Sequence, residues 1–276
     1  MLRAVRDTRL WVHDTGGDGE AIVFSHGLLW SADMYGPQIE ALRGRYRCIA
    51  YDHRGQGRSD VPAGDEVSIE TCTADAIALI EQLDIGPVHF VGLSMGGFVG
   101  MRIAARRPDL VRSLALLETA ADPEPAANIA KYKRLNMAVR LVGVHPRLGA
   151  KVMPIMFADS FLADPSRVGE VRHQERQLRA NAPTIYKAVN GVIRRRGCTH
   201  ELGSIRCPTL VLRGTEDTAI ARERAYALVD GIAGATWVEV DGAGHTSTME
   251  QPEAVTAALR AHLAAASEAQ SAPVER

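Results

Sequence analysis

Residues 88–97 have the sequence Val88-His89-Phe90-Val91-Gly92-Leu93-Ser94-Met95-Gly96-Gly97, a short apolar run followed at once by a glycine-rich turn. The apolar run is typical of a strand buried on both faces of a parallel sheet, and helical spacing begins directly after it, over residues 95–106. The glycines and the serine fit the pattern G-x-S-x-G, in which a sharp strand-to-helix turn holds the serine in a strained backbone conformation. Side chains two residues on either side of the serine would collide, which explains the glycines. The pattern predicts an exposed, reactive Ser94 at the carboxyl edge of a parallel sheet.

Similar short apolar runs recur along the chain, and we expect each to be a buried strand. They lie at residues 21–24, 48–51, 111–117, 209–212 and 236–240. Two further segments, 68–83 and 251–265, carry apolar residues at helical spacing, and residues 3–12 alternate as in a short antiparallel pair. Strands that alternate with helices over the whole chain predict an α/β fold with a doubly wound, mostly parallel sheet.

The alternation is interrupted between residues 122 and 206. This interval contains several stretches of helical length, punctuated by prolines, and no convincing strand. We expect it to form a helical cap at the carboxyl edge of the sheet, where open α/β sheets bind ligands. The predicted division is a core of residues 1–121 and 207–266, a cap of residues 122–206 and a flexible, low-complexity tail of residues 267–276.

Composition and charge limit the possible partners of the chain. The formal net charge of −1 over 276 residues gives no indication of a nucleic acid or anionic membrane partner. No stretch approaches the roughly 20 apolar residues of a membrane helix, and the first residues are charged where a signal peptide is apolar. The four cysteines are scattered without a C-x-x-C pair, which is typical of buried thiols in a reducing compartment. We therefore expect a soluble, cytoplasmic protein of the size of a single-chain enzyme, without a nucleic acid or membrane partner, and a homodimer stays open.

A serine hydroxyl needs a base within hydrogen-bond reach, and His245 is the histidine best placed to supply it. It lies in a flexible turn directly after the strand predicted at 236–240. A histidine at the carboxyl end of a strand can reach Ser94, and a neutral imidazole can take its proton. The other histidines fit surface, turn or core positions, and His26 is expected to brace its own loop by hydrogen bonding.

The third member of the predicted site is a carboxylate that orients the histidine. Asp217 follows the strand predicted at 209–212 and is the preferred candidate. Glu118, which ends the strand predicted at 111–117, and the adjacent Glu216 are the alternatives. Any of the three would lie at the same edge of the sheet as Ser94, because the carboxyl ends of parallel strands meet there.

When such a serine attacks a carbonyl group, the carbonyl oxygen becomes an oxyanion that needs two preorganised N–H donors. We expect these donors to be the N–H groups of Leu28 and Met95. The substrate pocket is expected to be lined by Trp30 and by four cap residues, although such residues also fill gaps in cores: Met137, Met153, Met156 and Phe157. No H-E-x-x-H pattern or carboxylate cluster indicates a metal site, and no G-K-[S/T] follows the turn as in a phosphate loop.

With these residues in place, the sequence resembles the α/β-hydrolase superfamily from about residue 3 to residue 262. Three stretches carry the resemblance, Gly92 to Gly97, Tyr51-Asp52-x-Arg54-Gly55-x-Gly57-x-Ser59 and Gly244-His245-x5-Gln251-Pro252. They look most like those of the 3-oxoadipate enol-lactonase group and of related cap-bearing esterases and C–C-bond hydrolases. The resemblance implies the α/β-hydrolase fold, with an eight-stranded sheet, helices on both faces and a helical cap. It also implies the absence of a metal or organic cofactor and hydrolysis through an acyl-enzyme.

By position, the resemblance assigns the roles of nucleophile, acid and base to Ser94, Asp217 and His245, in the chain order of the superfamily. The expected function is serine-dependent cleavage of a small carboxylic ester or lactone. Haloalkane dehalogenases and epoxide hydrolases are disfavoured, because they carry an aspartate where Ser94 stands. A C–C-bond hydrolase of vinylogous diketones, a perhydrolase or cofactor-free haloperoxidase, and a ligand-binding receptor on the same fold stay open as alternatives.

Overall fold

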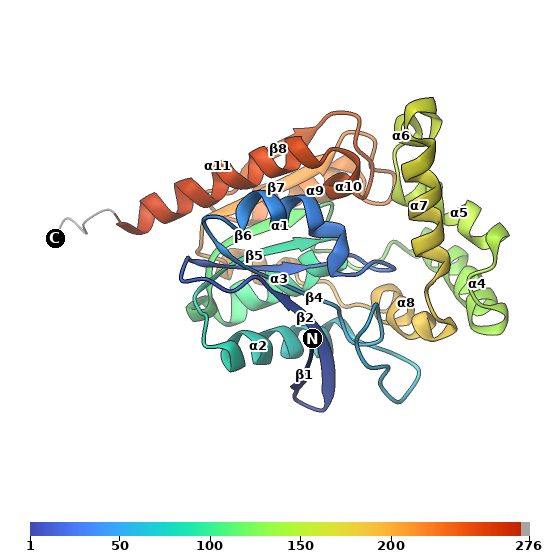
Figure 1. Cartoon of the computed structure of the whole chain (residues 1–276), viewed down its shortest axis with the longest axis horizontal. Coiled ribbons are helices and arrows are strands. Elements are labelled where there is room, and N and C mark those ends of the chain that lie inside the picture. Colours follow the sequence, from blue (N-terminus) through green and yellow to red (C-terminus); the bar gives the residue numbers. More distant parts are fainter. Residues whose placement is uncertain (272–276) are drawn as a thin grey trace.

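Eight strands form one sheet in the computed structural model, which describes residues 1–271 of the chain, with side chains through residue 268 (Figure 1). The strands lie in the order β1-β2-β4-β3-β5-β6-β7-β8. Only the pairs β1–β2 and β2–β4 are antiparallel, and all other neighbours are parallel. The bounds are Leu2–Val5 (β1), Thr8–Asp14 (β2), Ala21–Ser25 (β3), Arg47–Tyr51 (β4), Val88–Leu93 (β5), Val111–Leu117 (β6), Thr209–Gly214 (β7) and Thr236–Val240 (β8).

Burial along the strands explains this arrangement. Every residue of β3, β5 and β7 is buried, as expected of central parallel strands that are covered on both faces. In β2, at the antiparallel side of the sheet, buried residues alternate with less buried ones. The predicted α/β-hydrolase fold, with its mostly parallel eight-stranded sheet and an antiparallel opening pair, is confirmed.

Helices cover both faces of the sheet and bury a separate apolar cluster on each. One cluster includes residues of α2 (Ile69–Leu83), α3 (Met95–Arg106) and α9 (Arg222–Gly231). The cluster on the opposite face includes residues of α1 (Gly36–Leu42) and α11 (Pro252–Ser271). Figure 1 shows α11 and α2 on opposite sides of the sheet. The two layers leave the ends of the strands free to carry loops.

The interval between β6 and β7 contains helices and no strand, as the sequence predicted. Figure 1 shows α4 to α7 gathered at one end of the molecule, and α4 packs on α8 while α5 packs on α7. The cap helices are α4 (Ala126–Val142), α5 (Pro146–Met156), α6 (Asp159–Ala163), α7 (Val168–Arg179) and α8 (Tyr186–Ile193). Short 3-10 turns join them or flank the sheet: Ala32–Tyr35, Pro108–Leu110, Pro165–Arg167, Pro183–Ile185 and Thr199–Ser204.

The end of the chain differs from the expected flexible tail. Helix α11 continues through Ser271, past the predicted helix end at residue 265. The alanine-rich sequence favours a helix, and Leu263 and Ala266 stay buried in the structure. Ser267 Oγ also donates to Glu20 Oε2 at 2.6 Å. Residues 267–271 are therefore helical, and the remainder of the expected tail, 272–276, lies outside the described residues.

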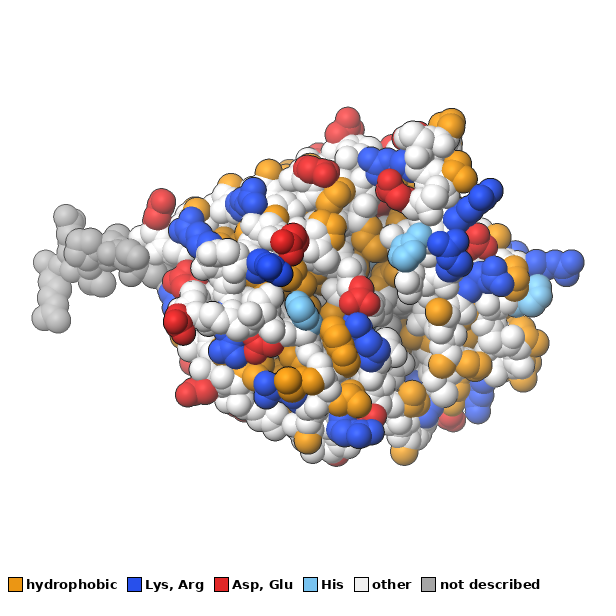
Figure 2. All heavy atoms as spheres, in the orientation of Figure 1, with side chains coloured by type: hydrophobic (Ala, Val, Ile, Leu, Met, Phe, Trp, Pro, Cys, Tyr) orange, Lys and Arg blue, Asp and Glu red, His pale blue; other side chains and the backbone are white. Residues whose placement is uncertain are grey.

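The charges are unevenly divided between core and cap. Residues 122–206 carry 15 Lys and Arg side chains and 7 Asp and Glu side chains, although the whole chain has a net charge of −1. Figure 2 shows acidic and basic side chains interspersed over the core and basic side chains near the cap helices.

Within residues 1–271 we find no helix with the length and apolar character needed to span a bilayer.

Candidate active site

Ser94 occupies a strained turn between β5 and α3. Its φ of 50° and ψ of −108° lie in a region that costs a non-glycine residue conformational energy. The turn is held from several sides: Ser94 N–H donates to Leu117 O at 2.8 Å, and Thr119 Oγ1 donates to Ser94 O at 2.9 Å. A Cβ atom at Gly92 would collide with the Gly96 carbonyl group, as the sequence pattern predicted. The surroundings thus force Ser94 into the turn.

His245 joins Ser94 to Asp217. Its Nε2 lies 3.0 Å from Ser94 Oγ, and its Nδ1 lies 3.1 Å from both carboxylate oxygens of Asp217. Because a carboxylate only accepts hydrogen bonds, the proton of the neutral ring belongs on Nδ1. Nε2 is then the acceptor for the Ser94 hydroxyl. All three residues are buried, and they come from the carboxyl ends of β5, β7 and β8.

The loop that carries Asp217 is fixed by backbone and arginine contacts. Asp217 Oδ1 accepts from the N–H groups of Ala219 at 2.8 Å and Ile220 at 3.1 Å. Arg213, at the end of β7, donates through Nη2 to Asp217 O and through Nε to Ile220 O. The carboxylate therefore has one oxygen fixed by the backbone and both oxygens near His245. Arg213 was not identified from the sequence.

Glu250 positions the loop that carries His245. Its carboxylate accepts from Gly244 N–H and Thr246 N–H, both at 3.0 Å, on either side of the histidine. It also accepts from Ala158 N–H of the cap at 2.7 Å. Glu250 is fully buried, and burial raises its pKa, although these hydrogen bonds act in the opposite direction. Sequence reasoning missed this residue, because nothing in the sequence indicates that Ala158 lies beside it.

The two alternative acids lie elsewhere. Glu216 accepts from the N–H and hydroxyl groups of Ser160 at the cap surface. Glu118 is fully buried and accepts from Gly214 N–H at 3.2 Å, and no hydrogen bond joins it to His245 in the described part of the chain. Burial, and then the charge of Asp217, hold the pKa of Glu118 well above its usual range. Of the three candidates, only Asp217 contacts the histidine.

The raised pKa of Glu118 predicts a pH-dependent contribution to stability. The unfolded chain releases this proton above its ordinary pKa of about 4.3, whereas the folded chain retains it. The contribution of Glu118 to the free energy of unfolding is therefore fully present below that pH. It is lost as the pH rises, by at most about 1.4 kcal/mol per pH unit. Glu118→Gln has no proton to lose at this position. The free energy of unfolding of this variant is therefore expected to increase relative to that of the wild type as the pH rises.

Urea unfolding of both proteins between about pH 5 and pH 8 measures this difference. Glu250 and the other titrating groups are common to both proteins, so their effects cancel in the comparison. Parallel stability curves for the two proteins would show that Glu118 is ionised in the folded chain.

The segments of the two predicted oxyanion donors, Leu28 and Met95, meet at Ser94. Met95 follows Ser94 directly as the first residue of α3. Leu28 lies in the loop after β3, and this loop approaches the serine so closely that a Cβ at Gly27 would stand 3.7 Å from Ser94 Cβ. That Cβ would also lie 3.0 Å from the Leu93 side chain. Gly27 therefore permits the approach that brings Leu28 to the site.

The residue after Leu28 ties this loop to the rest of the protein. Leu29 has a φ of 74°, unusual for a residue with a side chain. Its N–H donates to Gln56 Oε1 at 2.9 Å, and its carbonyl accepts from Asn181 of the cap at 2.9 Å. Gln56 Nε2 in turn lies 3.4 Å from Met95 Sδ. Gln56 thus bridges the loop that carries Leu28 and the start of α3, and Asn181 links that loop to the cap.

His26 forms the hydrogen bonds of a bracing residue. Its Nε2 accepts from His53 N–H at 2.9 Å, so the ring proton lies on Nδ1, which contacts Gly27 O at 2.7 Å. The ring is fully buried, and burial lowers its pKa. His26 therefore remains neutral and orients the backbone beside Leu28.

A cavity of about 150 Å³ adjoins Ser94 and His245. Its walls are mostly apolar and come from α3, the loop at residues 27–30 and the cap helices α4, α5 and α8. It is smaller than the roughly 300–1,000 Å³ of pockets for drug-sized ligands. The cap residues in its walls include Tyr132, Leu135, Asn136, Val139, Val152, Ile155, Met156, Val189, Val192 and Arg195.

The predicted pocket residues divide into three groups. Trp30 and Met156 line the cavity. Met153 and Phe157 are buried in the apolar cluster around Trp30 and are absent from the cavity wall. Met137 is 55% exposed on the outer side of α4, and its prediction as a pocket residue was wrong. The helix period explains the error, because the cavity-facing residues of α4 are at positions 132, 135, 136 and 139.

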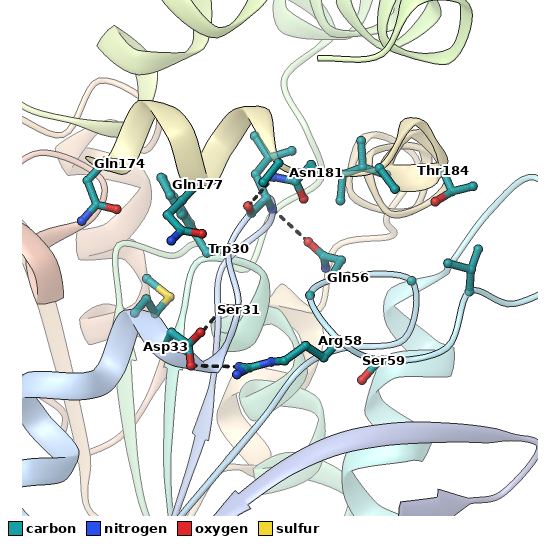
Figure 3. A pocket seen from close by; sticks show the side chains of 18 of the residues that line it. Trp30, Ser31, Asp33, Gln56, Arg58, Ser59, Gln174, Gln177, Asn181 and Thr184 are labelled. Carbon is teal, nitrogen blue, oxygen red and sulfur yellow. Dashed lines mark hydrogen bonds and ion pairs between the residues drawn. The ribbon is translucent and has the colours of Figure 1, made fainter. Parts of the chain in front are cut away.

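A second, larger cavity of about 440 Å³ lies between the cap and the loop at residues 55–61. Figure 3 shows Gln174, Gln177 and Asn181 of the cap on one side of it and Arg58 and Ser59 of the loop on the other. It shares Leu29 and Trp30 with the first cavity but includes neither Ser94 nor His245. The loop at residues 27–30 therefore separates the two cavities, and Ser94 and His245 line the smaller one.

Known proteins share this fold and are between 27% and 29% identical to this chain in sequence. An enol-lactonase from Burkholderia xenovorans superposes with a TM-score of 0.88 at 29% identity, over 96% of this chain and all of that chain (100%). An esterase from Thermogutta terrifontis superposes with a TM-score of 0.87 at 28% identity, over 96% and 98% of the two chains. The proposed carbamate hydrolase RutD of Rhizobium rhizogenes is 27% identical over 237 residues, which are 86% of this chain and 89% of that protein.

No group of three His, Cys, Asp or Glu side chains within residues 1–268 is arranged to hold a metal ion.

Residues 22–258 match the sequence profile of the alpha/beta hydrolase family, from β3 into α11. This span includes the serine turn, the acid loop, the histidine loop and the whole cap. The chain therefore belongs to the alpha/beta hydrolase family.

Proposed function

We propose that the protein is a serine hydrolase that cleaves a small carboxylic ester or lactone through an acyl-enzyme. The observation that carries the proposal is the hydrogen-bonded series from Ser94 Oγ through His245 to Asp217 beside the apolar cavity. An activated serine needs a base within reach and a third group that orients the base. The names of the enol-lactonase and esterase neighbours support the same class of reaction.

In the acylation step, Ser94 Oγ attacks the carbonyl carbon while His245 Nε2 takes the hydroxyl proton. The carbonyl electron pair moves onto oxygen, which accepts from the N–H groups of Leu28 and Met95. Loss of one such donor typically slows hydrolysis by about 10²–10³-fold. His245 then returns its proton to the departing alkoxy oxygen as the C–O bond breaks, leaving the acyl group on Ser94.

In the deacylation step, water takes the place of the serine hydroxyl. His245 removes a proton from the water as its oxygen attacks the acyl carbon, and the same N–H groups hold the second oxyanion. Collapse releases the carboxylic acid, and His245 protonates Ser94 Oγ. Asp217 accepts a hydrogen bond from His245 Nδ1–H throughout and stabilises the imidazolium in both steps.

A trapping experiment tests the proposal directly. Incubation with a p-nitrophenyl alkylphosphonate is expected to release one nitrophenolate per chain and to leave the phosphonyl group on Ser94, as identified by peptide mass spectrometry. Ser94→Ala is expected to remain unlabelled. Label on another residue, or none on folded protein, would contradict the assignment of Ser94.

A turnover screen then separates the chemical alternatives. Aryl esters, γ- and δ-lactones and acyl-homoserine lactones test the proposed reaction, and vinylogous 1,5-diketones test a C–C-bond hydrolase. An assay with halide and peroxide detects perhydrolase or haloperoxidase activity. A ligand-binding receptor would bind members of these sets with negligible turnover of any.

A further inference from the structure

A buried arginine lines the same cavity as Ser94 and His245. Arg195 follows helix α8, and its side chain is only 2% exposed. Its guanidinium carbon lies 4.2 Å from the centre of the Phe98 ring. Phe98 stands one helical turn after Ser94, and its N–H donates to Ser94 O at 3.1 Å. A single aromatic ring thus separates the cation from the turn that carries the proposed nucleophile.

Among the residues that the structure describes, only one of the three guanidinium nitrogens of Arg195 donates hydrogen bonds. Nη1 donates to Glu124 Oε2 and to Val192 O, both at 2.9 Å. Nε and Nη2 are buried and have no hydrogen-bond partner among the described residues. These two nitrogens form one edge of the guanidinium, with parallel N–H groups that match the two oxygens of a carboxylate.

The other buried arginines of the described chain show that this vacancy is unusual here. In Arg54, Arg102 and Arg213, both Nε and Nη2 donate to oxygen atoms of the protein. Buried polar groups of folded proteins are nearly always satisfied. Arg195 departs from that rule. Of these four buried arginines, it is also the one that lines the cavity of the proposed catalytic site.

The surroundings favour a negatively charged partner for the free edge. Burial lowers the pKa of Arg195, and the neighbouring Glu124 only partly opposes this effect. A second acceptor would therefore stabilise the cation further. Glu124 is itself engaged, since its Oε1 accepts from Asn128 at 2.9 Å. The excess of basic residues in the cap, noted above, attracts anions toward this end of the molecule.

We propose that Arg195 binds a carboxylate of the substrate, so that the preferred substrates are short esters or lactones that carry a second, ionised carboxyl group. The assignment of the ester or lactone rests on the proposed function of Ser94, whereas the anion site rests on Arg195 itself. The mostly apolar cavity of about 150 Å³ then holds a short hydrocarbon segment between the scissile carbonyl and the carboxylate.

Two esters that differ at one end test the proposal in the wild-type protein. Monomethyl glutarate carries a carboxylate where dimethyl glutarate carries a neutral methyl ester. We expect kcat/KM to be roughly 10- to 100-fold higher for monomethyl glutarate, the usual effect of a hydrogen bond to a charged group. Proton release at constant pH measures both rates, corrected for the two equivalent esters of the dimethyl compound. Equal rates, or a preference for the neutral ester, would overturn the proposal.

A double variant shows whether Arg195 causes the preference. Arg195→Met combined with Glu124→Gln keeps a long side chain over Phe98 and avoids a buried, unpaired carboxylate. Its ratio of kcat/KM values for the two esters is expected to fall to about one. Glu124→Gln alone is the matched control and is expected to retain the preference, because the free edge of Arg195 is intact. Retention of the preference by the double variant would assign it to another residue.

Calorimetric titration separates this inference from the proposed function and does not depend on turnover. Ser94→Ala protein is titrated with each ester, and tighter binding of monomethyl glutarate is expected, by roughly 10-fold or more. Such binding without turnover by the wild type would support the anion site and contradict the hydrolase. Turnover that depends on Ser94, with no difference in binding or rate between the esters, would contradict the anion site alone.

Discussion

Replacing Ser94 with alanine is expected to lower kcat for hydrolysis of a p-nitrophenyl ester by about 10⁶-fold, as loss of the nucleophile does in serine hydrolases. The alanine has a Cβ, as serine does, so the strained turn with its φ of 50° is unchanged and the protein folds as before. What is lost is the oxygen that His245 Nε2 contacts at 3.0 Å. Burst and steady-state release of nitrophenolate measure the effect.

The double variant Ser94→Ala, His245→Ala provides the control. Groups that act as a unit are not additive, so removing the base after the nucleophile is expected to cost almost nothing more. A large further loss would mean that His245 still catalyses hydrolysis in the absence of Ser94, by activating water directly. A Ser94→Ala protein with full activity would contradict the proposed function as a whole.

The sheet could be predicted from the sequence because its central strands have a local signature. Strands such as β3 and β5 are covered on both faces, so their residues form short continuous apolar runs. The helices α1 and α9 lack such a signature. In α9 only Ala225 and Leu228 are buried, and the seven residues of α1 give less than two full helical periods. Position in the fold, rather than local pattern, determines these two helices.

The same contrast applies to the site. Ser94, Asp217 and His245 each follow a predicted strand, so the topology alone brings them to one edge of the sheet. Glu250 and Gln56 act through contacts with segments far away in the sequence, Ala158 and Leu29. No local pattern encodes such contacts. The vacancy at Arg195 requires a full account of hydrogen bonds, which only a three-dimensional structure provides.

The residues that line the pocket could be predicted from the sequence only in part. The cavity-facing residues of α4 recur at positions 132, 135, 136 and 139, a helical period that the sequence contains. Apolar character alone selected Met137, which lies next to this stripe and points outward. The period fixes which residues share a face of the helix, but only the packing of the cap determines which face covers Ser94.

Replacing Asp217 with asparagine is expected to lower kcat by about 10⁴-fold while leaving the fold intact. Asp217 Oδ1 accepts from the N–H groups of Ala219 and Ile220, so the amide oxygen of asparagine is retained at that position. The amide nitrogen then replaces Oδ2 beside His245 Nδ1, where it donates instead of accepting. The histidine is driven into the tautomer with its proton on Nε2, which cannot take a proton from Ser94.

Glu118→Gln is the matched control, because it makes the same amide-for-carboxyl change in a second buried acid, whose pKa is raised by burial and by the charge of Asp217. Its kcat is expected to stay within about threefold of the wild-type value, since no hydrogen bond between Glu118 and His245 is lost and surroundings that favour a protonated acid tolerate an amide. Comparing kcat of the two variants on one aryl ester therefore decides which acid orients the base. A large loss in Glu118→Gln with little loss in Asp217→Asn would transfer the role to Glu118. A large loss in both would indicate that the two carboxyl groups act as one coupled pair, with a single shared proton.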